Sequence, residues 1–250
     1  MSVEERGAPP PRLLSTLWRL ALIGLVFALG AWASASGTLA AIARYREDIV
    51  FLAAQHLQLT AVSSAIAIVA GIPAGILLAR RSLGLFGPVL TQIINLGTTI
   101  PTLAILALAT TVLGLGSPPA IFALAVLTLL PIVLNTVAGL RAVPPALIEA
   151  ARGMGMTNLQ ILTQVELPNA LFVMAAGIRT ALAINIGTVP LAFLIGGGGL
   201  GELIFTGIDL MDTGLLLAGA IPTALLAILV DLVAGQLQYW LVPRGVNPLR

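Results

Sequence analysis

Cysteine and lysine are both missing from this chain of 250 residues, and histidine occurs only once. Without cysteine there are no disulfides and no thiolate ligands for a metal ion. Without lysine, the chain lacks the side chain with which a P-loop reaches the β- and γ-phosphates of a nucleotide. Any nucleotide that drives this protein must therefore bind to another subunit.

Charged residues are also scarce, at 9% of the chain against roughly 25% in soluble domains. The basic residues are all arginines, scattered along the sequence, and the net charge is +2. This pattern excludes the basic face of a nucleic-acid-binding protein. His56 stands alone, and no carboxylates are paired within the apolar runs. The sequence therefore predicts neither a catalytic site nor a metal site.

What remains is apolar: 58% of the residues are hydrophobic. Six runs approach the roughly 20 apolar residues that cross a hydrocarbon core of about 30 Å. They cover residues 13–34, 57–79, 86–113, 118–140, 169–195 and 214–241. The composition and these runs predict an all-α polytopic membrane protein with six transmembrane helices.

The first run has a second interpretation. Arginines precede it, and Ala33-Ser34-Ala35 matches the A-x-A cleavage site of a secretory signal peptide. The uncharged stretch over residues 20–43 is longer than the apolar region of a usual signal peptide, which favours a retained helix. We expect residues 1–12 to be a disordered cytoplasmic tail and residues 13–48 to form a transmembrane helix and an external loop.

The arginines between the runs predict an orientation. With the N-terminus inside, only Arg44 and Arg46 fall outside. The arginines that fall inside are Arg6, Arg12, Arg80, Arg81, Arg141, Arg152, Arg244 and Arg250. Because loops on the cytoplasmic side are enriched in basic residues, both termini are predicted to be cytoplasmic.

One polar segment, EAARGMGMTNLQILTQVELP at residues 149–168, lies on the predicted inner side. The signals for helix starts and ends in this segment and just before it are Pro144-Pro145, Gly153, Gly155, Thr157-x-x-Gln160 and Pro168. A proline pair suits a first helical turn, glycines end a helix, and Thr-x-x-Gln is a capping box. The segment is therefore predicted as two short helices around a glycine turn, the second ended by Pro168, lying across the membrane face.

The same segment resembles the EAA loop of binding-protein-dependent ABC importer permeases. The matching positions are Glu149-Ala150-Ala151, Gly155, Val165 and Leu167-Pro168, with Val165 where the family usually has isoleucine. In that family the loop is the coupling helix that docks on the ATPase subunit. The resemblance implies that Glu149, Ala150, Ala151 and Gly155 form the docking face, with Leu167 and Pro168 completing the coupling motif. The alternative is that Glu149 is a solvated helix residue and Gly155 an ordinary helix terminator.

A narrower resemblance covers residues 55–246. Stretches at residues 99–104, 150–157, 176–180, 195–201 and 243–245 are similar to permeases of osmoprotectant importers for glycine betaine, carnitine and choline. It implies a five-helix permease domain at residues 49–250, with a coupling loop at 141–168, in a bacterial inner membrane. It also implies three kinds of partner: a second permease, identical or paralogous, an ATPase dimer that binds ATP and Mg, and a separate external binding protein. The chain itself would hold no cofactor.

Polar residues inside the runs are candidates for the translocation path, because polar groups in a bilayer tend to face the bundle interior. They are Gln92, Asn95, Thr98, Thr99, Pro101, Asn135, Asn185 and Thr188. Pro101 is expected to interrupt the third run. Hydrogen bonding between helices is the alternative role for each polar side chain. Aromatic residues form only 5% of the chain, so no tight aromatic cage for a cation is expected.

Three further patterns lead to structural expectations. Gly71-x-x-x-Gly75 favours a close helix contact over flexibility around Pro73. Residues 196–199 are four glycines that predict a hinge or re-entrant turn on the outer side. Arg179 and Asp231 both fall towards the inner ends of their runs and are expected to neutralise each other.

The sequence therefore indicates the permease subunit of an ATP-driven importer for compatible solutes. One alternative is a permease for another small polar solute such as an amino acid. Another is a proton-coupled carrier, which normally needs acids within the membrane. Of the acidic residues, Asp231 is the clear one inside a run, and this disfavours the carrier.

Overall fold

The computed structural model describes residues 37–80, 84, 86–243 and 245–246, together with the isolated positions 24, 30 and 35. All regular structure in these residues is helical. Among the described residues, four helices are long and apolar enough to cross a membrane, and the count is five if the bent pair α4–α5 is one span. The all-α fold is therefore confirmed. The predicted span over residues 13–34 lies outside the described residues apart from two isolated positions.

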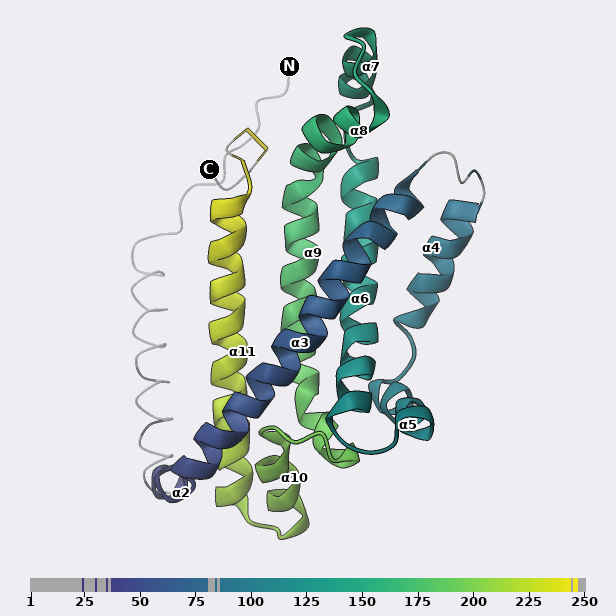
Figure 1. Ribbon diagram of the computed structural model, residues 1–250. Coiled ribbons are helices and arrows are strands. Elements are labelled where there is room, and N and C mark those ends of the chain that lie inside the picture. Colours follow the sequence, from purple (N-terminus) through teal and green to yellow (C-terminus); the bar gives the residue numbers. More distant parts are fainter. Residues whose placement is uncertain are drawn as a thin grey trace, which may run out of the picture.

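The helices follow one another in a bundle in which α3 crosses α6 and α9 obliquely, with α11 on one flank and α4 on the other (Figure 1). Their bounds are α2 Thr38–Arg44, α3 Arg46–Ala79, α4 Phe86–Gly97, α5 Thr102–Leu113, α6 Ser117–Arg141, α7 Pro145–Gly153, α8 Asn158–Gln160, η2 Ile161–Glu166, α9 Leu167–Thr188, η3 Val189–Ile195, α10 Gly201–Asp209 and α11 Thr213–Leu241.

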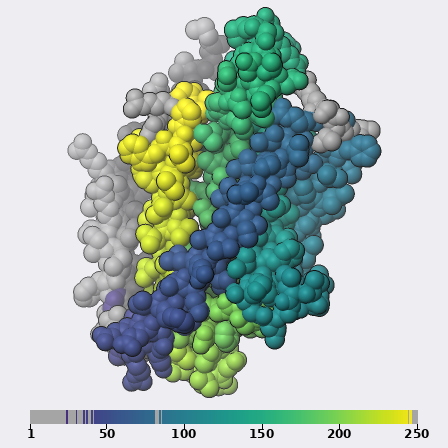
Figure 2. All heavy atoms as spheres, in the orientation of Figure 1, coloured from purple at the N-terminus to yellow at the C-terminus, as the bar shows by residue number. Residues whose placement is uncertain are grey.

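The two ends of the bundle differ. The segment α7–α8 projects at one end, where α3, α6 and α11 also terminate, whereas α2, α5 and α10 lie at the other end (Figure 1). We call these the α7 end and the α10 end. In the space-filling view, the α7 segment stands clear of the bundle as a narrow tip (Figure 2).

The spans α6 and α11 begin and end within one residue of their predicted runs. In contrast, α3 begins at Arg46, eleven residues before its run. Two acidic residues, Glu47 and Asp48, lie in its first turn, where a negative charge complements the helix dipole. The sequence analysis placed these charged residues in an external loop. In the structure they form the first turn of α3.

The third span is broken, as Pro101 predicted. Helix α4 ends at Gly97, α5 begins at Thr102, and the two axes differ by 96°. The hydroxyls of Thr98 and Thr99 donate to the carbonyl oxygens of Asn95 and Leu96, each at 2.7 Å. The same two carbonyl oxygens also accept the Thr98 and Thr99 amides, so the end of α4 is closed by local hydrogen bonds.

Pro168 does not end a helix, so that prediction was wrong. The chain is helical without interruption from α8 through α9, and a π-helical turn, η2, directly precedes the proline. A proline inside an α-helix clashes with the carbonyl four residues back. The wider turn relieves this clash: the Leu167 amide bonds to Leu162 O, five residues back, and Asn169 Nδ2 donates to Val165 O at 2.7 Å.

Glycines allow α3 and α6 to pack closely. A Cβ atom added to Gly75 would lie 2.5 Å from Thr136 Cβ, and one added to Gly71 would lie 3.0 Å from Ile132 Cγ2. Real side chains do not fit at such distances. The close contact predicted from Gly71-x-x-x-Gly75 is therefore confirmed.

Gly177 plays the same part between α9 and α6, where an added Cβ would overlap Asn135 Cβ. We expect Gly177→Ala to lower the free energy of unfolding by about 1–3 kcal/mol, because Asn135 Cβ cannot swing away from its own helix. Gly187→Ala is the matched control, since it lies in the same helix with nothing within 4 Å of the added atom. Thermal unfolding in detergent measures both, and equal stabilities would contradict the close α6–α9 packing.

The four glycines at residues 196–199 form a tight turn at the α10 end. Gly196, Gly198 and Gly199 have φ values of +78°, +80° and +88°, a region that favours glycine. The turn lies against α3, where the Gly199 amide donates to Gln55 Oε1 at 3.2 Å. It leads into α10, a helix that the sequence did not predict, which packs on α11.

Candidate coupling site and translocation path

The coupling segment is built by local signals. Helix α7 starts with Pro144 at its N-cap and Pro145 in the first turn, and it ends at Gly153. Beyond it, the Gly155 amide bonds to Arg152 O at 2.9 Å and the Met156 amide to Ala151 O at 3.1 Å. This pair of bonds, with Gly155 at φ +79°, is a Schellman motif. The predicted glycine turn is confirmed.

The capping box predicted after this turn is also present. The Gln160 amide donates to Thr157 Oγ1 at 3.4 Å, and the Thr157 amide donates to Gln160 Oε1 at 2.8 Å. Both ends of the turn are thus fixed by hydrogen bonds. The tip is consequently a defined shape rather than a loose loop.

The structure divides the residues predicted for ATPase coupling. Glu149, Ala150 and Gly155 are exposed at the tip. Ala151 is only 1% exposed, so it does not share their face, and its small side chain lets α7 lie against η2. Leu167 and Pro168 are half-buried at the start of α9, where Leu167 packs on the cluster around Leu140 and Met174.

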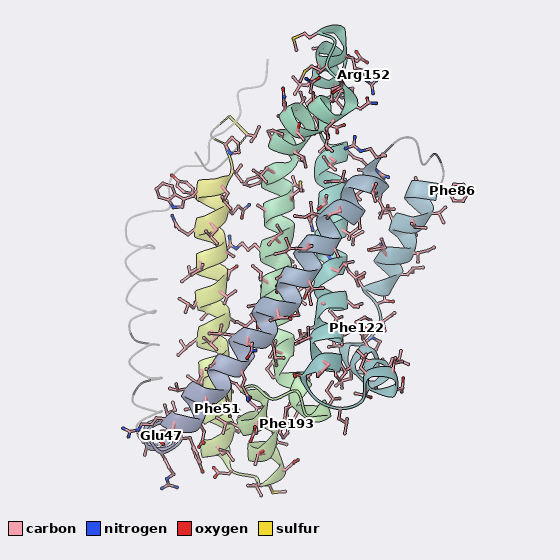
Figure 3. All side chains as sticks on the ribbon, viewed as in Figure 1. Glu47, Phe51, Phe86, Phe122, Arg152 and Phe193 are labelled. Carbon is pink, nitrogen blue, oxygen red and sulfur yellow. The ribbon has the colours of Figure 1, made fainter. Side chains whose placement is uncertain are left out.

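Large apolar side chains are exposed on the same tip, which the sequence analysis missed. Leu147, Met154 and Leu159 are 44%, 75% and 69% exposed. Leu147 lies in α7, Met154 directly follows it and Leu159 lies in α8; Arg152, near the end of α7, marks this tip in Figure 3. An exposed apolar patch rimmed by polar residues marks a protein contact. Their positions close to the predicted Gly153–Gly155 turn could have indicated this exposed apolar surface from the sequence alone.

The end of α3 is tethered to η2, just before α9, by an ion pair that the sequence did not suggest. Arg80 Nη1 donates to Glu166 Oε2 at 2.9 Å, and Arg141 Nη2 donates to Leu78 O at 3.3 Å. The ion pair borders a cavity of about 690 Å³ between α7 and the ends of α3, α4 and α6.

The polar residues predicted for the translocation path fall into two groups. Five lie on α4 or at its break and are exposed on the chain: Gln92, Asn95, Thr98, Thr99 and Pro101. The others are Asn135 on α6 and Asn185 and Thr188 on α9. The chain by itself does not bring the two groups to one cavity, so the path remains a prediction.

Asn185 lies fully buried between α3 and α9. Its amide nitrogen donates to Ser63 Oγ at 2.8 Å and Ser64 Oγ at 2.7 Å, and the nearby His56 Nε2 lies 3.0 Å from Ile186 O. Asn135 is half-buried and bonds within its own helix, to Pro131 O at 2.9 Å. Thr188 likewise bonds to Ile184 O and Asn185 O. In this conformation Asn185 and His56 join α9 to α3, whereas Asn135 and Thr188 bond within their own helices.

Arg179 of α9 and Asp231 of α11 form the ion pair that their depths predicted. Arg179 Nε and Nη2 donate to the two carboxylate oxygens of Asp231, each at 2.6 Å. This fork is the strong, bidentate form of an arginine–carboxylate contact. The pair borders a cavity of about 630 Å³ between α9 and α11.

A bundle of long apolar helices with a bent helix pair on one flank and a helical segment projecting at one end defines a polytopic membrane protein. The chain belongs to the family described as the inner membrane component of binding-protein-dependent transport systems, which it matches over residues 71–245. It is a permease subunit of an ABC importer.

Named relatives agree with this assignment. The chain is 51% identical to the osmoprotectant import permease protein OsmY of Salmonella typhimurium, over 84% of this chain and 88% of that protein. It is 42% identical to the glycine betaine/carnitine/choline transport system permease protein OpuCD of Bacillus subtilis, over 78% and 83%. Among solved structures, the inward-facing MetNI methionine ABC transporter matches with a TM-score of 0.71 and 25% identity, over 78% of this chain and 96% of that one.

Proposed function

We propose that this permease carries osmoprotectants such as glycine betaine, choline or carnitine, and that residues 49–250 are its permease domain. The names of the relatives support the solute class. Residues 13–48 would add one transmembrane helix and an external loop to the five-span core, after a cytoplasmic tail at residues 1–12.

The observation that carries the coupling role is the apolar tip. Leu147, Met154 and Leu159 would be buried in a groove of an ATPase subunit, with Glu149 and Ala150 beside them. Burying a side chain of this size contributes about 1.5–3 kcal/mol, so three anchors supply substantial affinity. ATP and Mg bind to that partner, in which the hydrolysis takes place.

The charge distribution supports a cytoplasmic position for the tip. Arg80, Arg141 and Arg152 lie at the α7 end, whereas Arg44 and Arg46 lie at the α10 end, near the position of Glu47 in Figure 3. Because cytoplasmic loops carry the excess of arginine, the α7 end faces the cytoplasm. Helix α11 ends on that side, which agrees with cytoplasmic termini.

The transport cycle follows from these positions. A separate binding protein delivers solute at the α10 end, and a second permease, identical or paralogous, completes the path. Closure of the ATPase dimer draws the two α7 tips together and opens the spans outward, and hydrolysis resets them inward. The Arg80–Glu166 tether and the continuous helix from α8 through α9 transmit the movement.

The test is uptake into proteoliposomes that contain the complete complex, with ATP inside and the cognate binding protein outside. We expect uptake of glycine betaine, choline or carnitine that requires both ATP and the binding protein. Uptake driven by a proton gradient without ATP would overturn the proposal.

An amino acid is the second candidate solute, because the structural likeness to a methionine importer at 25% identity favours it. The same vesicles distinguish the two classes. Methionine uptake without uptake of any quaternary ammonium solute would replace the first candidate by the second.

A further inference from the structure

The Arg179–Asp231 ion pair lies deep in the membrane-spanning region. Arg179 is twelve residues beyond the start of α9 at Leu167, and Asp231 is ten residues before the end of α11 at Leu241. At 1.5 Å per residue, Arg179 lies about 18 Å from Leu167 within the continuous helix, and Asp231 lies about 15 Å from the end of α11. Both charges therefore lie well inside a hydrocarbon core about 30 Å thick.

Both side chains are nevertheless open at the surface of the chain. The side chain of Arg179 is 41% exposed and that of Asp231 is 38% exposed. Contact between a charged side chain and lipid acyl chains costs free energy. Charged side chains within a membrane therefore face the interior of a bundle or a water-filled cavity. The groove between α9 and α11 is therefore expected to face a bundle interior or water and not lipid.

Arg179 keeps hydrogen-bonding capacity for a ligand. A guanidinium carries five N–H donors, and Asp231 accepts two of them. Within the described part of the chain, no other group accepts a hydrogen bond from Arg179. Gly235 provides the space for this arrangement, since an added Cβ there would lie 3.1 Å from Arg179 Nη1.

The groove around the pair has a distinct chemistry. Besides the two charges, its lining includes Phe172, Thr180 and Gln238, and Gln238 Nε2 donates to Phe172 O at 3.3 Å. A guanidinium with free donors matches a carboxylate. A carboxylate near an aromatic ring matches a quaternary ammonium group. The groove thus carries both halves of a site for a zwitterion.

We propose that this groove is a solute-contact site of the translocation path and takes small zwitterions with a carboxylate and a quaternary ammonium group. The proposal rests on the function proposed above and adds the residues that meet the solute. The solute carboxylate accepts hydrogen bonds from the free N–H groups of Arg179. The quaternary ammonium lies beside the Asp231 carboxylate, and the ring of Phe172, about two helical turns from Arg179, belongs to the same lining.

The ion pair also makes this contact weak. Arg179 and Asp231 already neutralise each other, so the solute exchanges one charge partner for another and does not meet a bare charge. A transport site must bind well enough to admit a solute and weakly enough to release it. A paired site of this kind meets both conditions.

The first experiment asks whether the groove is wet. The chain has no cysteine, so Thr180→Cys in the assembled complex introduces a unique thiol of this chain. We expect a charged thiosulfonate reagent to modify it, and glycine betaine with the loaded binding protein and ATP to slow the reaction several-fold. The control is Leu229→Cys, two residues from Asp231 and therefore on another face of α11, which should react slowly and without solute protection. A Thr180→Cys thiol that stays unmodified would overturn the proposal.

The second experiment asks whether Arg179 meets the solute carboxylate. Arg179→Lys keeps the positive charge beside Asp231 but loses the planar fork of donors. We expect turnover of glycine betaine to fall about tenfold, a loss equivalent to about 1.4 kcal/mol. Choline has no carboxylate, so its turnover should fall much less, while stimulation of ATP hydrolysis by the loaded binding protein stays within about twofold.

The outcomes separate the possible roles. An equal fall for both solutes, together with a loss of ATP hydrolysis, would show a structural ion pair and overturn the proposal. Neutralising another ion pair, with Arg46→Gln and Glu47→Gln at the α10 end, should leave the ratio of the two turnovers unchanged. If the unsubstituted complex takes up no quaternary ammonium solute, the proposed function itself fails, and that result needs no variant.

Discussion

Replacement of Gly155 by valine is expected to reduce ATP-driven uptake by about tenfold or more while leaving the permease in the membrane. Gly155 has φ +79° and open space around its Cα, so the backbone and not the surroundings opposes a side chain. The left-handed conformation costs an L-residue about 1–2 kcal/mol, and a β-branched residue is a marked outlier there. A cost of this size lowers the fraction of correctly shaped tips about 5–30-fold.

Gly153→Val is the matched control. Gly153 lies two residues earlier at the end of α7, also with nothing within 4 Å of an added Cβ, but without a positive φ. Uptake by this variant should stay within about twofold of the unsubstituted complex. Both variants are measured in the proteoliposome assay, with membrane content followed by immunoblot. Equal uptake by the two variants would show that the Schellman turn does not position the coupling helix.

The features of the tip that could be predicted are those fixed by neighbouring residues. Gly155 and the Thr157-x-x-Gln160 pattern each predict hydrogen bonds between residues close in sequence. The structure contains both sets of bonds. The break at Pro101 follows for the same reason, since a missing N–H has a local consequence. Docking by Glu149 and Ala150 stays a prediction drawn from the family resemblance.

Features that depend on packing were harder to predict. Pro168 was expected to stop a helix, but the π-turn before it keeps α8 and α9 continuous. Ala151 matches the family motif beside Ala150, yet the helical period turns it toward η2. The Arg80–Glu166 ion pair joins residues that are 86 positions apart, and only the folded bundle brings them together.

The ion pair of Arg179 and Asp231 is the exception among long-range contacts. Few charges lie inside the apolar runs, and an unpaired charge there is costly, so depth alone left few choices of partner. The neutral polar side chains are more numerous, and the sequence did not indicate which partner each of them bonds to. Asn185 was a candidate for the path or for hydrogen bonding between helices, and in this conformation it binds Ser63 and Ser64 of α3.

Placing aspartates at two of the exposed apolar positions of the tip, with Met154→Asp and Leu159→Asp together, is expected to abolish stable binding of the ATPase subunit. Each side chain contributes about 1.5–3 kcal/mol when buried, so their joint loss weakens binding by at least about 100-fold. Both positions are exposed on the free chain. The fold of the permease should therefore be unaffected, and its thermal unfolding in detergent should not change.

The α10 end offers a control of the same chemistry. Met211 is 93% exposed in the turn between α10 and α11, far from the tip, so Met211→Asp should keep full ATPase binding. Co-purification of the ATPase with tagged permease measures both variants, and titration of the ATPase onto permease in nanodiscs gives the affinity. A doubly substituted tip that still holds the ATPase with unchanged affinity would place the docking surface elsewhere. Loss of binding with Met211→Asp alone would mean that aspartate substitution disturbs the permease as a whole. The expected pattern, loss at the α7 end and retention at the α10 end, follows because Met154 and Leu159 lie on the tip whereas Met211 lies at the opposite end of the bundle.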